Sequence, residues 1–431
     1  MYFVFAPLAF LVSSLLLPFV FLLALFHRRI GLLISSSFFP RISPNKAGAT
    51  RPTIWFHAAS LGEYQGLVPL IAEFKRSLRC FVAVSCTSLT AYERLSRETS
   101  VDAYFLLPYD HPFFILRLLR RLKPALFLVA ETELWPNLFS TLSLMRIPIV
   151  LVNGRLSDYS FPKYLRFSFL FAPFLRLISR AFVQSELDGG RFKALGLRAE
   201  KISVLPSTKH DRDYPSFGGE ELEDLAGELG IDPLKPCFVA GCVRKGEEGL
   251  VLDAFEAARA SVPDLQMLFV PRHPEYFDHM AQCMEERGLA FHRRSAGNSS
   301  FASRGVCLLD TIGELNKAYA LSSFSLIGGT LIDIGGHNPL EAAAYAKPLI
   351  VGPYCSNYAD VILSLRMASA LVEVDSATSL CDALCDLSID FKRVRSMGEA
   401  AKGVSAGYRG STEVIVAEVL GSYERRLSAF F

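Results

Sequence analysis

The first 26 residues carry no charge, and the whole 431-residue sequence has only 20% charged residues. It also lacks a C-x-x-C pair, and its nine cysteines are scattered, which excludes a disulfide framework or a compact zinc module. With 29 glycines, 23 prolines and 51% hydrophobic residues, collagen-like and disordered classes are excluded. The length is typical of two or three domains, and unpaired thiols are typical of a cytosolic compartment.

The uncharged segment at residues 1–26 is long enough to cross a bilayer as a helix. At about 1.5 Å per residue it reaches ~39 Å, against ~30 Å for the hydrocarbon core. A cleaved signal peptide is the alternative, but such peptides carry positive charge before the apolar run. Here Arg28 and Arg29 follow it, and no acidic residue occurs before Glu63. We therefore predict an uncleaved single-pass transmembrane helix, with the body of the protein in the cytoplasm.

The remaining charge divides the chain into two halves of opposite sign. Residues 27–212 hold 26 basic and 13 acidic residues, whereas residues 213–431 hold 19 and 30. A basic half favours an anionic partner, and since no nucleic-acid module is recognisable, we expect membrane lipids rather than nucleic acid. The polar, Gly- and Pro-containing segment 213–221 is the predicted linker between two domains, 27–212 and 222–431.

Short apolar runs bounded by turn residues predict parallel strands in both halves, because such strands are apolar on both faces. The predicted strands are 54–59, 81–87, 125–130, 148–153, 181–185 and 202–205, then 237–241, 266–271, 306–309, 324–328, 349–352 and 371–374. Helical stretches such as 64–78 and 111–123 lie between them. This alternation predicts two doubly wound α/β domains.

One stretch, 159–180, combines large apolar residues with four basic residues and no acidic one. It is either a lipid-binding amphipathic surface or a buried helix with extended arginine side chains, interrupted near Pro173. Next to an apolar N-terminal segment, we favour membrane contact.

Three loops in the first half carry candidate site residues. Ser60, Gly62 and Glu63 follow the first strand, where Glu63 either acts as a general base or completes a helix cap with Ser60, and spacing alone favours the cap. Glu131 and Glu133 follow the third predicted strand, and Asn153 and Arg155 follow the fourth. Without a nearby histidine or third carboxylate, the glutamate pair favours acceptor recognition or a structural role over metal binding.

The second half has candidates for binding an anion. Gly335 and Gly336 precede Asn338, which is typical of a helix N-cap, and Glu341 follows in the first turn. Arg272 and His273 sit in a proline-stiffened turn after a strand, and Arg244 follows another strand. Lys209 lies just before the linker. For each of these, a turn or cap without a ligand is the alternative.

Taken together, five motifs occur in the same order as in the 3-deoxy-D-manno-octulosonic acid (Kdo) transferase family. They are Ser60-Leu61-Gly62-Glu63, Glu131-Thr132-Glu133-Leu134-Trp135-Pro136-Asn137, Asn153-Gly154-Arg155-Leu156-Ser157, Pro271-Arg272-His273-Pro274 and Gly335-Gly336-His337-Asn338-Pro339-Leu340-Glu341. The chain resembles this family over roughly residues 1–425. Each motif is weak alone, but the ordered set is specific.

The resemblance implies a GT-B fold, in which two Rossmann-like domains face each other across a cleft. It implies inverting transfer of Kdo from CMP-Kdo to a lipid A precursor, lipid IVA, at the cytoplasmic face of the inner membrane. More than one Kdo could be added in succession. No metal ion or other cofactor is implied.

The resemblance also assigns roles to residues and domains. It makes Glu63 the catalytic base and residues 27–212 the acceptor-binding domain, with the last helix of the chain packing back on it. Acceptor-binding residues are then Ser60, Gly62, Glu131, Glu133, Asn153 and Arg155. Donor-binding residues are Lys209, Arg244, Arg272, His273, Gly335, Gly336, Asn338 and Glu341. The alternatives are a transferase using another nucleotide sugar and a non-catalytic carbohydrate-binding membrane protein.

Overall fold

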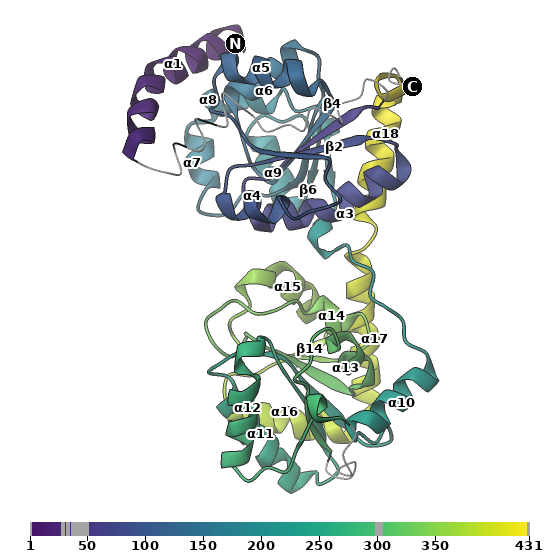
Figure 1. Cartoon of the computed structure of the whole chain (residues 1–431). Helices are drawn as coiled ribbons and strands as arrows, with labels where there is room; N and C mark the ends of the chain where they lie inside the picture. Colours follow the sequence, from purple (N-terminus) through teal and green to yellow (C-terminus); the bar gives the residue numbers. More distant parts are fainter. Residues whose placement is uncertain (1, 27–30, 32–34, 36–50, 298–304, 429–431) are drawn as a thin grey trace. The chain divides into compact units, whose positions relative to one another are not determined.

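The computed structural model describes residues 2–26, 31, 35, 51–297 and 305–428. These residues form two compact units (Figure 1). Unit 1 contains the described residues up to Arg212 together with those from Tyr408 onward, and unit 2 contains those within Asp213–Gly407. Each unit is an α/β domain with one parallel sheet, which confirms the predicted fold class at this level.

The sheet of unit 1 has the strand order β3-β2-β1-β4-β5-β6-β7, and all of its strand pairs are parallel. The strands are β1 (Thr53–His57), β2 (Phe81–Cys86), β3 (Ala103–Leu106), β4 (Pro124–Ala130), β5 (Ile149–Gly154), β6 (Arg180–Val183) and β7 (Ile202–Val204). Neighbouring side chains on one strand enter different cores: Trp55 packs in one cluster, and Ile54 and Phe56 pack in another. Helices therefore cover both faces, as the apolar strands require.

The helices of unit 1 are α1 (Tyr2–Phe26), α3 (Leu61–Ser77), α4 (Leu89–Leu95), α5 (Pro112–Leu122), α6 (Pro136–Leu144), α7 (Phe161–Arg166), α8 (Ser168–Leu175), α9 (Glu186–Ala194) and α18 (Ser411–Ser428), with 3₁₀ turns η1 (Ala199–Lys201) and η2 (Thr208–His210). Local signals explain their ends. For example, His111 caps α5, Pro112 occupies its first turn, and Lys123 ends it in the left-handed conformation.

The N-terminal helix α1 packs one face against unit 1. Ser13 is buried there: its Oγ accepts a hydrogen bond from Asn137 Nδ2 at 3.3 Å, and its carbonyl oxygen accepts one from the Tyr109 hydroxyl at 3.0 Å. The opposite face of α1 is exposed, including Leu15 and Phe19.

Within the described parts of the chain, no helix combines the length and apolar character needed to cross a membrane. The predicted transmembrane helix over residues 1–26 is therefore not supported.

The stretch 159–180 forms two short helices, α7 and α8. The chain breaks at Phe167, which has non-helical backbone angles, whereas Pro173 lies inside α8. The prediction of a break at Pro173 was wrong: Pro173 is the sixth residue of the eight-residue α8, and the helix ends two residues later at Leu175.

The C-terminal helix α18 belongs to unit 1 and lies beside α3 (Figure 1). Its Ile415, Val416 and Val419 are buried in the same cluster as the α3 core residues. Asp211 holds the start of this helix, because its carboxylate accepts the backbone N–H groups of Gly410 at 3.0 Å and Thr412 at 2.6 Å.

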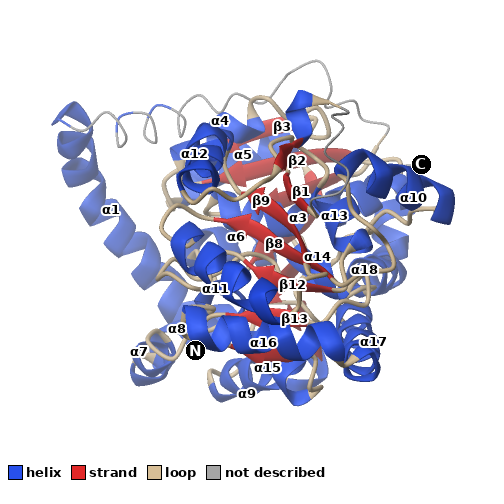
Figure 2. Ribbon diagram, turned by 90° about the horizontal axis from the view of Figure 1, so that it is seen from below, coloured by secondary structure: helices blue, strands red, loops and turns tan. Residues whose placement is uncertain are grey.

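Unit 2 has the strand order β10-β11-β9-β8-β12-β13-β14, again parallel throughout; Figure 2 colours the strands red and the helices blue. The strands are β8 (Cys237–Val243), β9 (Gln266–Pro271), β10 (His292–Arg293), β11 (Val306–Leu308), β12 (Phe324–Ile327), β13 (Leu349–Val351) and β14 (Leu371–Glu373). The helices are α10 (Gly219–Leu229), α11 (Glu248–Ser261), α12 (Phe277–Glu286), α13 (Leu315–Leu321), α14 (Leu340–Ala343), α15 (Ala359–Met367), α16 (Ala377–Ile389) and α17 (Phe391–Gly407), with 3₁₀ turns η3 (Pro274–Tyr276), η4 (Arg294–Ala296) and η5 (Ser356–Tyr358).

All twelve predicted strands are present, and within the residues that the structure describes two further strands, β3 and β10, were missed. Strand β10 has two residues, both polar, so no apolar run marks it. Strand β3 is an apolar run as long as β6, which was predicted, so the sequence offered the same signal for it.

Candidate functional site

The first candidate site lies at the switch point of the unit 1 sheet. From β1 the chain proceeds to β2 and β3 on one side, and β4 then pairs with β1 on the other side. Parallel sheets bind ligands at the carboxyl ends of strands at such a point, because the loops diverge there. The loops after β1 and β4 carry Ser60–Glu63 and Glu131–Glu133, which the structure therefore brings together.

The carboxylate of Glu63 is held at the first turn of α3. Its Oε2 accepts the Ala59 backbone N–H at 2.8 Å, and its Oε1 accepts the Ser60 hydroxyl at 3.0 Å. The Ser60 Oγ in turn accepts the Glu63 N–H at 3.3 Å. Glu63 thus completes the predicted cap while staying half-buried, and Gly62 beside it is exposed. Glu63 can therefore both cap the helix and act as a general base, because the hydrogen bonds orient its carboxylate.

Glu131 and Glu133 add two half-buried carboxylates at the same edge of the sheet. Glu131 directly follows β4 and has a left-handed backbone (φ 54°), which lets its N–H pair with the Val152 carbonyl at 2.9 Å. Three carboxylates in one half-buried site repel one another, so the site favours protons, hydroxyl donors or cations.

Burial and mutual repulsion shift these groups toward the protonated form. Burial raises the pKa of Glu63; the Ala59 N–H opposes this shift, and the charge of Glu131 adds to it. Burial likewise raises the pKa of Glu131, against the charges of Arg155 and Lys209. The pKa of Glu133 rises to about 7, through burial first and then the charge of Glu63. A carboxylate with a raised pKa is a stronger base near neutral pH.

The side chain of Asn153, predicted to bind the acceptor, connects β5 to η2. Its side chain is buried, with Nδ2 donating to Thr208 Oγ1 at 2.9 Å and Oδ1 accepting the Thr208 N–H at 3.0 Å. Asn153 thereby ties the end of β5 to η2, which carries the exposed Lys209. We assign Asn153 and Thr208 as positioning residues. Thr208 was not identified from the sequence, because no local pattern connects it to Asn153, which lies 55 positions away.

Arg155, exposed after β5, and Lys209 supply positive charge beside Glu131. Lys209, which is predicted to bind the donor, belongs to unit 1, and the other predicted donor residues belong to unit 2.

The second candidate site lies at the switch point of the unit 2 sheet, between β8 and β12. Its loops are tied together by Glu247, which is 1% exposed. The Oε2 of Glu247 accepts the N–H groups of Arg244 at 2.8 Å and Gly329 at 2.7 Å, and Oε1 accepts that of Leu331 at 3.0 Å. Burial raises the pKa of Glu247 and these hydrogen bonds oppose the shift. The sequence analysis did not identify Glu247, because Glu247 and Glu248 together have the pattern of ordinary surface residues.

Basic side chains gather on these loops. Arg244 Nη1 contacts His273 Nε2. The pKa of His337 falls to about 4 because of burial and the charges of Arg272, Arg244 and His273, so all four groups lie within electrostatic reach of one another. We call Arg244, Arg272 and His273 the cationic cluster; it lies beside the neutral His337 and suits a phosphate or carboxylate.

The segment 335–341 differs in part from its prediction. The helix after Asn338 is present but short: α14 is one turn, with the Leu340 N–H donating to Asn338 Oδ1 at 3.1 Å. Four residues sum to a weak dipole, so the helix end by itself contributes little to anion binding, and the predicted anion site here stays a prediction.

The two glycines before Asn338 are explained by the backbone itself. Gly335 and Gly336 have φ of 89° and 78°, and a Cβ at Gly335 would lie 2.7 Å from the Asn357 side chain. Glu341 is half-buried, and its charge acts on Cys242 and Tyr319.

Two Rossmann-like units, each with a polar cluster at the switch point of its sheet, define an α/β protein of the GT-B class. A similar solved structure supports this fold assignment. The structure of UDP-GlcNAc 2-epimerase from Neisseria meningitidis bound to UDP-GlcNAc aligns over 86% of this chain and 100% of its own with a TM-score of 0.56. At 14% identity, this similarity shows the fold alone.

Sequence relatives identify the family. The family profile "3-Deoxy-D-manno-octulosonic-acid transferase (kdotransferase)" matches residues 32–212. The 3-deoxy-D-manno-octulosonic acid transferase of Haemophilus influenzae is 31% identical, over 86% of this chain and 87% of the relative. That of Bordetella pertussis is 32% identical, over 85% and 88%. The chain belongs to the 3-deoxy-D-manno-octulosonic acid transferase family, a family of glycosyltransferases, and the predicted membership is confirmed.

Proposed function

We propose that this protein transfers Kdo from CMP-Kdo to a lipid A precursor, lipid IVA, with inversion at the anomeric carbon. The observation that carries the proposal is the oriented, half-buried carboxylate of Glu63 at the switch point of unit 1 in a chain of this family. An acceptor hydroxyl is a weak nucleophile, and a positioned carboxylate with a raised pKa can take its proton.

The chemistry is a single displacement. The acceptor oxygen forms a bond to the anomeric carbon of Kdo as its proton passes to Glu63. The bond from that carbon to the CMP phosphate breaks, and CMP leaves as a phosphomonoester. The sugar passes through an oxocarbenium-like state, as in glycoside hydrolysis, so the charge building on the leaving phosphate needs stabilisation.

Unit 2 supplies groups for the donor. The cationic cluster offers two guanidinium groups, which can each donate two parallel hydrogen bonds to a phosphate or to the Kdo carboxylate. Glu341, at the first turn after Asn338, is the candidate for the ribose hydroxyls. Glu247 keeps the loops of this cluster in place through its backbone hydrogen bonds.

Unit 1 supplies groups for the acceptor, an anionic acylated disaccharide. Arg155 and Lys209 can neutralise its phosphates, and Glu131 and Glu133 can accept its hydroxyl groups. Ser60 and Gly62 shape the loop that holds Glu63.

We further propose that unit 1 lies on the cytoplasmic face of the inner membrane. The exposed face of α1 includes Leu15 and Phe26, 70% and 78% exposed. The N-cap residue of α5, His111, touches this helix, since Ser14 Oγ and His111 Nε2 lie 3.1 Å apart. Helix α5 lines a pocket of about 610 Å³ formed by Phe113, Leu116, Arg117, Arg120 and Arg121. Apolar side chains beside arginines suit the boundary between acyl chains and anionic headgroups.

The test is incubation with CMP-Kdo and lipid IVA, with mass spectrometry of the products. We expect a mass increase equal to one Kdo or a small whole number of them, and none with a UDP-sugar in place of CMP-Kdo. Glu63→Gln keeps the hydrogen-bond acceptor for Ala59 but cannot take a proton, so it should bind CMP and lose transfer. Transfer by Glu63→Gln at the normal rate would exclude Glu63 as the base, and no product from the unchanged chain would exclude the reaction.

A further inference from the structure

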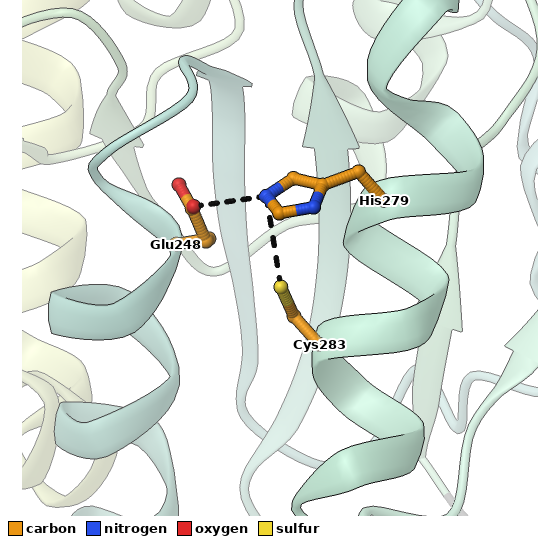
Figure 3. Close-up of side chains that lie close together, drawn as sticks. All are labelled: Glu248, His279 and Cys283. Carbon is orange, nitrogen blue, oxygen red and sulfur yellow. Dashed lines mark hydrogen bonds and ion pairs between the residues drawn. The ribbon is translucent and has the colours of Figure 1, made fainter.

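Three metal-ligating side chains converge on one side of unit 2, outside both candidate sites. Figure 3 shows His279 pointing from α12 toward Glu248 at the start of α11, with Cys283 one turn further along α12. His279 Nε2 lies 3.2 Å from Glu248 Oε1 and 3.8 Å from Cys283 Sγ, and the three ligand atoms all lie within 4.8 Å of one another.

These separations fit one small cation. Zinc binds sulfur at ~2.3 Å and nitrogen or oxygen at ~2.0–2.2 Å in tetrahedral geometry, which sets ligand atoms about 3.3–3.8 Å apart. A thiolate, an imidazole and a carboxylate are also the donor set that zinc prefers over magnesium or calcium. Three protein ligands leave a fourth position for water, and His279, 37% exposed, keeps the site open to solvent.

The ligand charges also suit a cation. A bound Zn²⁺ would take the place of the Cys283 thiol proton and would be balanced by the carboxylate of Glu248. The pair His279-x-x-x-Cys283 is visible in the sequence, but only the fold shows that Glu248 completes it.

We propose that Glu248, His279 and Cys283 form an exchangeable Zn²⁺ site that links the start of α11 to α12. The site adjoins the donor loop, because Glu248 Oε2 also accepts the N–H of Gly246 at 2.5 Å and Glu247 is the next residue back. It belongs to unit 2, whereas Glu63 belongs to unit 1, and it takes no part in the proposed transfer chemistry.

The test uses the full chain, stripped with a chelator and titrated with Co²⁺, whose thiolate complexes absorb in the near ultraviolet. We expect one equivalent of Co²⁺ to produce this band and one equivalent of Zn²⁺ to abolish it. Cys283→Ser should remove the band, and His279→Ala and Glu248→Gln should keep a weaker one with at least about tenfold lower affinity. Cys385→Ser, which removes a half-buried thiol on α16, is the matched control and should behave like the unchanged chain.

Stability gives a second readout that needs no sulfur absorption. Zn²⁺ should raise the melting temperature of the unchanged chain and of Cys385→Ser, but not that of Cys283→Ser, because only the native site binds the ion. The melting temperature without metal shows whether each variant folds. An unchanged band in Cys283→Ser, or equal Zn²⁺ stabilisation of all variants, would overturn the proposal. Neither readout depends on transfer activity, so this proposal and the proposed function can fail separately.

Discussion

The Oε2 atom of Glu247 accepts the backbone N–H of Gly329 at 2.7 Å, which joins the loop after β8 to the loop after β12. The same oxygen accepts the Arg244 N–H at 2.8 Å. One buried carboxylate therefore sets the position of the loop that carries Arg244 against the loop that precedes Gly335. The proposed donor site is thus held together by a residue that need not touch the donor.

Replacing Glu247 should weaken donor binding. In Glu247→Ala the N–H groups of the buried Gly329 and Leu331 and of the half-buried Arg244 lose their acceptor, at a cost of about 1–3 kcal/mol for each that stays dry. We expect at least tenfold weaker CMP binding by calorimetry, and Glu247→Gln should lose less because it keeps one acceptor oxygen. Glu373→Ala, which breaks only an exposed pair with Arg366, is the control and should bind CMP normally. Normal CMP affinity in Glu247→Ala would show that the loops hold without this carboxylate.

Removing the charge of Glu131 should move the pH profile of transfer. Glu63 must be ionised to act as a base, so activity rises as the pH rises through the Glu63 pKa. The charge of Glu131 is one cause that raises this pKa. In Glu131→Gln the Glu63 pKa falls, and the acid limb of kcat/KM should shift to lower pH. The exposed Glu186→Gln on α9 serves as the control; an acid limb that stays in place in Glu131→Gln would mean that another group produces it.

Asp110 caps a helix of unit 1 from a distant segment. Helix α6 has no side-chain cap of its own, and the Asp110 carboxylate accepts the N–H groups of Asn137 at 3.0 Å and Leu138 at 2.9 Å. Asp110→Ala should lower the free energy of unfolding of unit 1 by about 1–3 kcal/mol. Both tryptophans, Trp55 and Trp135, lie in unit 1, so their fluorescence during urea unfolding reports on this unit.

The carboxyl group of Asp110 should also make the stability of unit 1 depend on pH. Burial raises the pKa of Asp110 from 3.8 to about 6. The folded state therefore holds a proton that the unfolded state has lost, and this contribution to stability disappears as the pH rises from about 4 through 6. Asp110→Asn keeps an acceptor but cannot ionise, so its unfolding midpoint should vary less over this range. An identical pH dependence in the two proteins would contradict the assignment.

The basic face of α5 should determine binding to anionic membranes. Each basic residue near an anionic surface contributes about 1 kcal/mol, so Arg117→Gln combined with Arg120→Gln should weaken binding by roughly 30-fold. The measurement is co-sedimentation with vesicles of phosphatidylglycerol and phosphatidylethanolamine at low and high salt. Arg395→Gln on α17 of unit 2 is the control. Equal binding of the double variant would place membrane contact elsewhere.

Much of this protein is encoded locally. Buried parallel strands are apolar on both faces, so runs such as Phe81–Cys86 and Gln266–Pro271 are visible without knowing their neighbours. Cap residues such as Ser60 act within one turn, which is why the start of α3 was predictable. The loops that follow these strands also had to meet at one edge of a sheet, so Glu63 and Glu131 could be named as site residues.

Other features depend on contacts between distant residues, and only the tertiary structure decided them. Four contacts illustrate this, and they join segments that lie 31 to 201 positions apart in the sequence. They pair Glu247 with Gly329, Asn153 with Thr208, Asp211 with Thr412 at the start of α18, and Glu248 with His279. Composition made residues 1–26 resemble a membrane span, whereas the structure packs one face of α1 on the protein. The local sequence determines which segments become strands and helices, because secondary-structure preferences act between residues close in the chain. Which side chains meet in a buried space is determined by the topology, because it brings distant segments together.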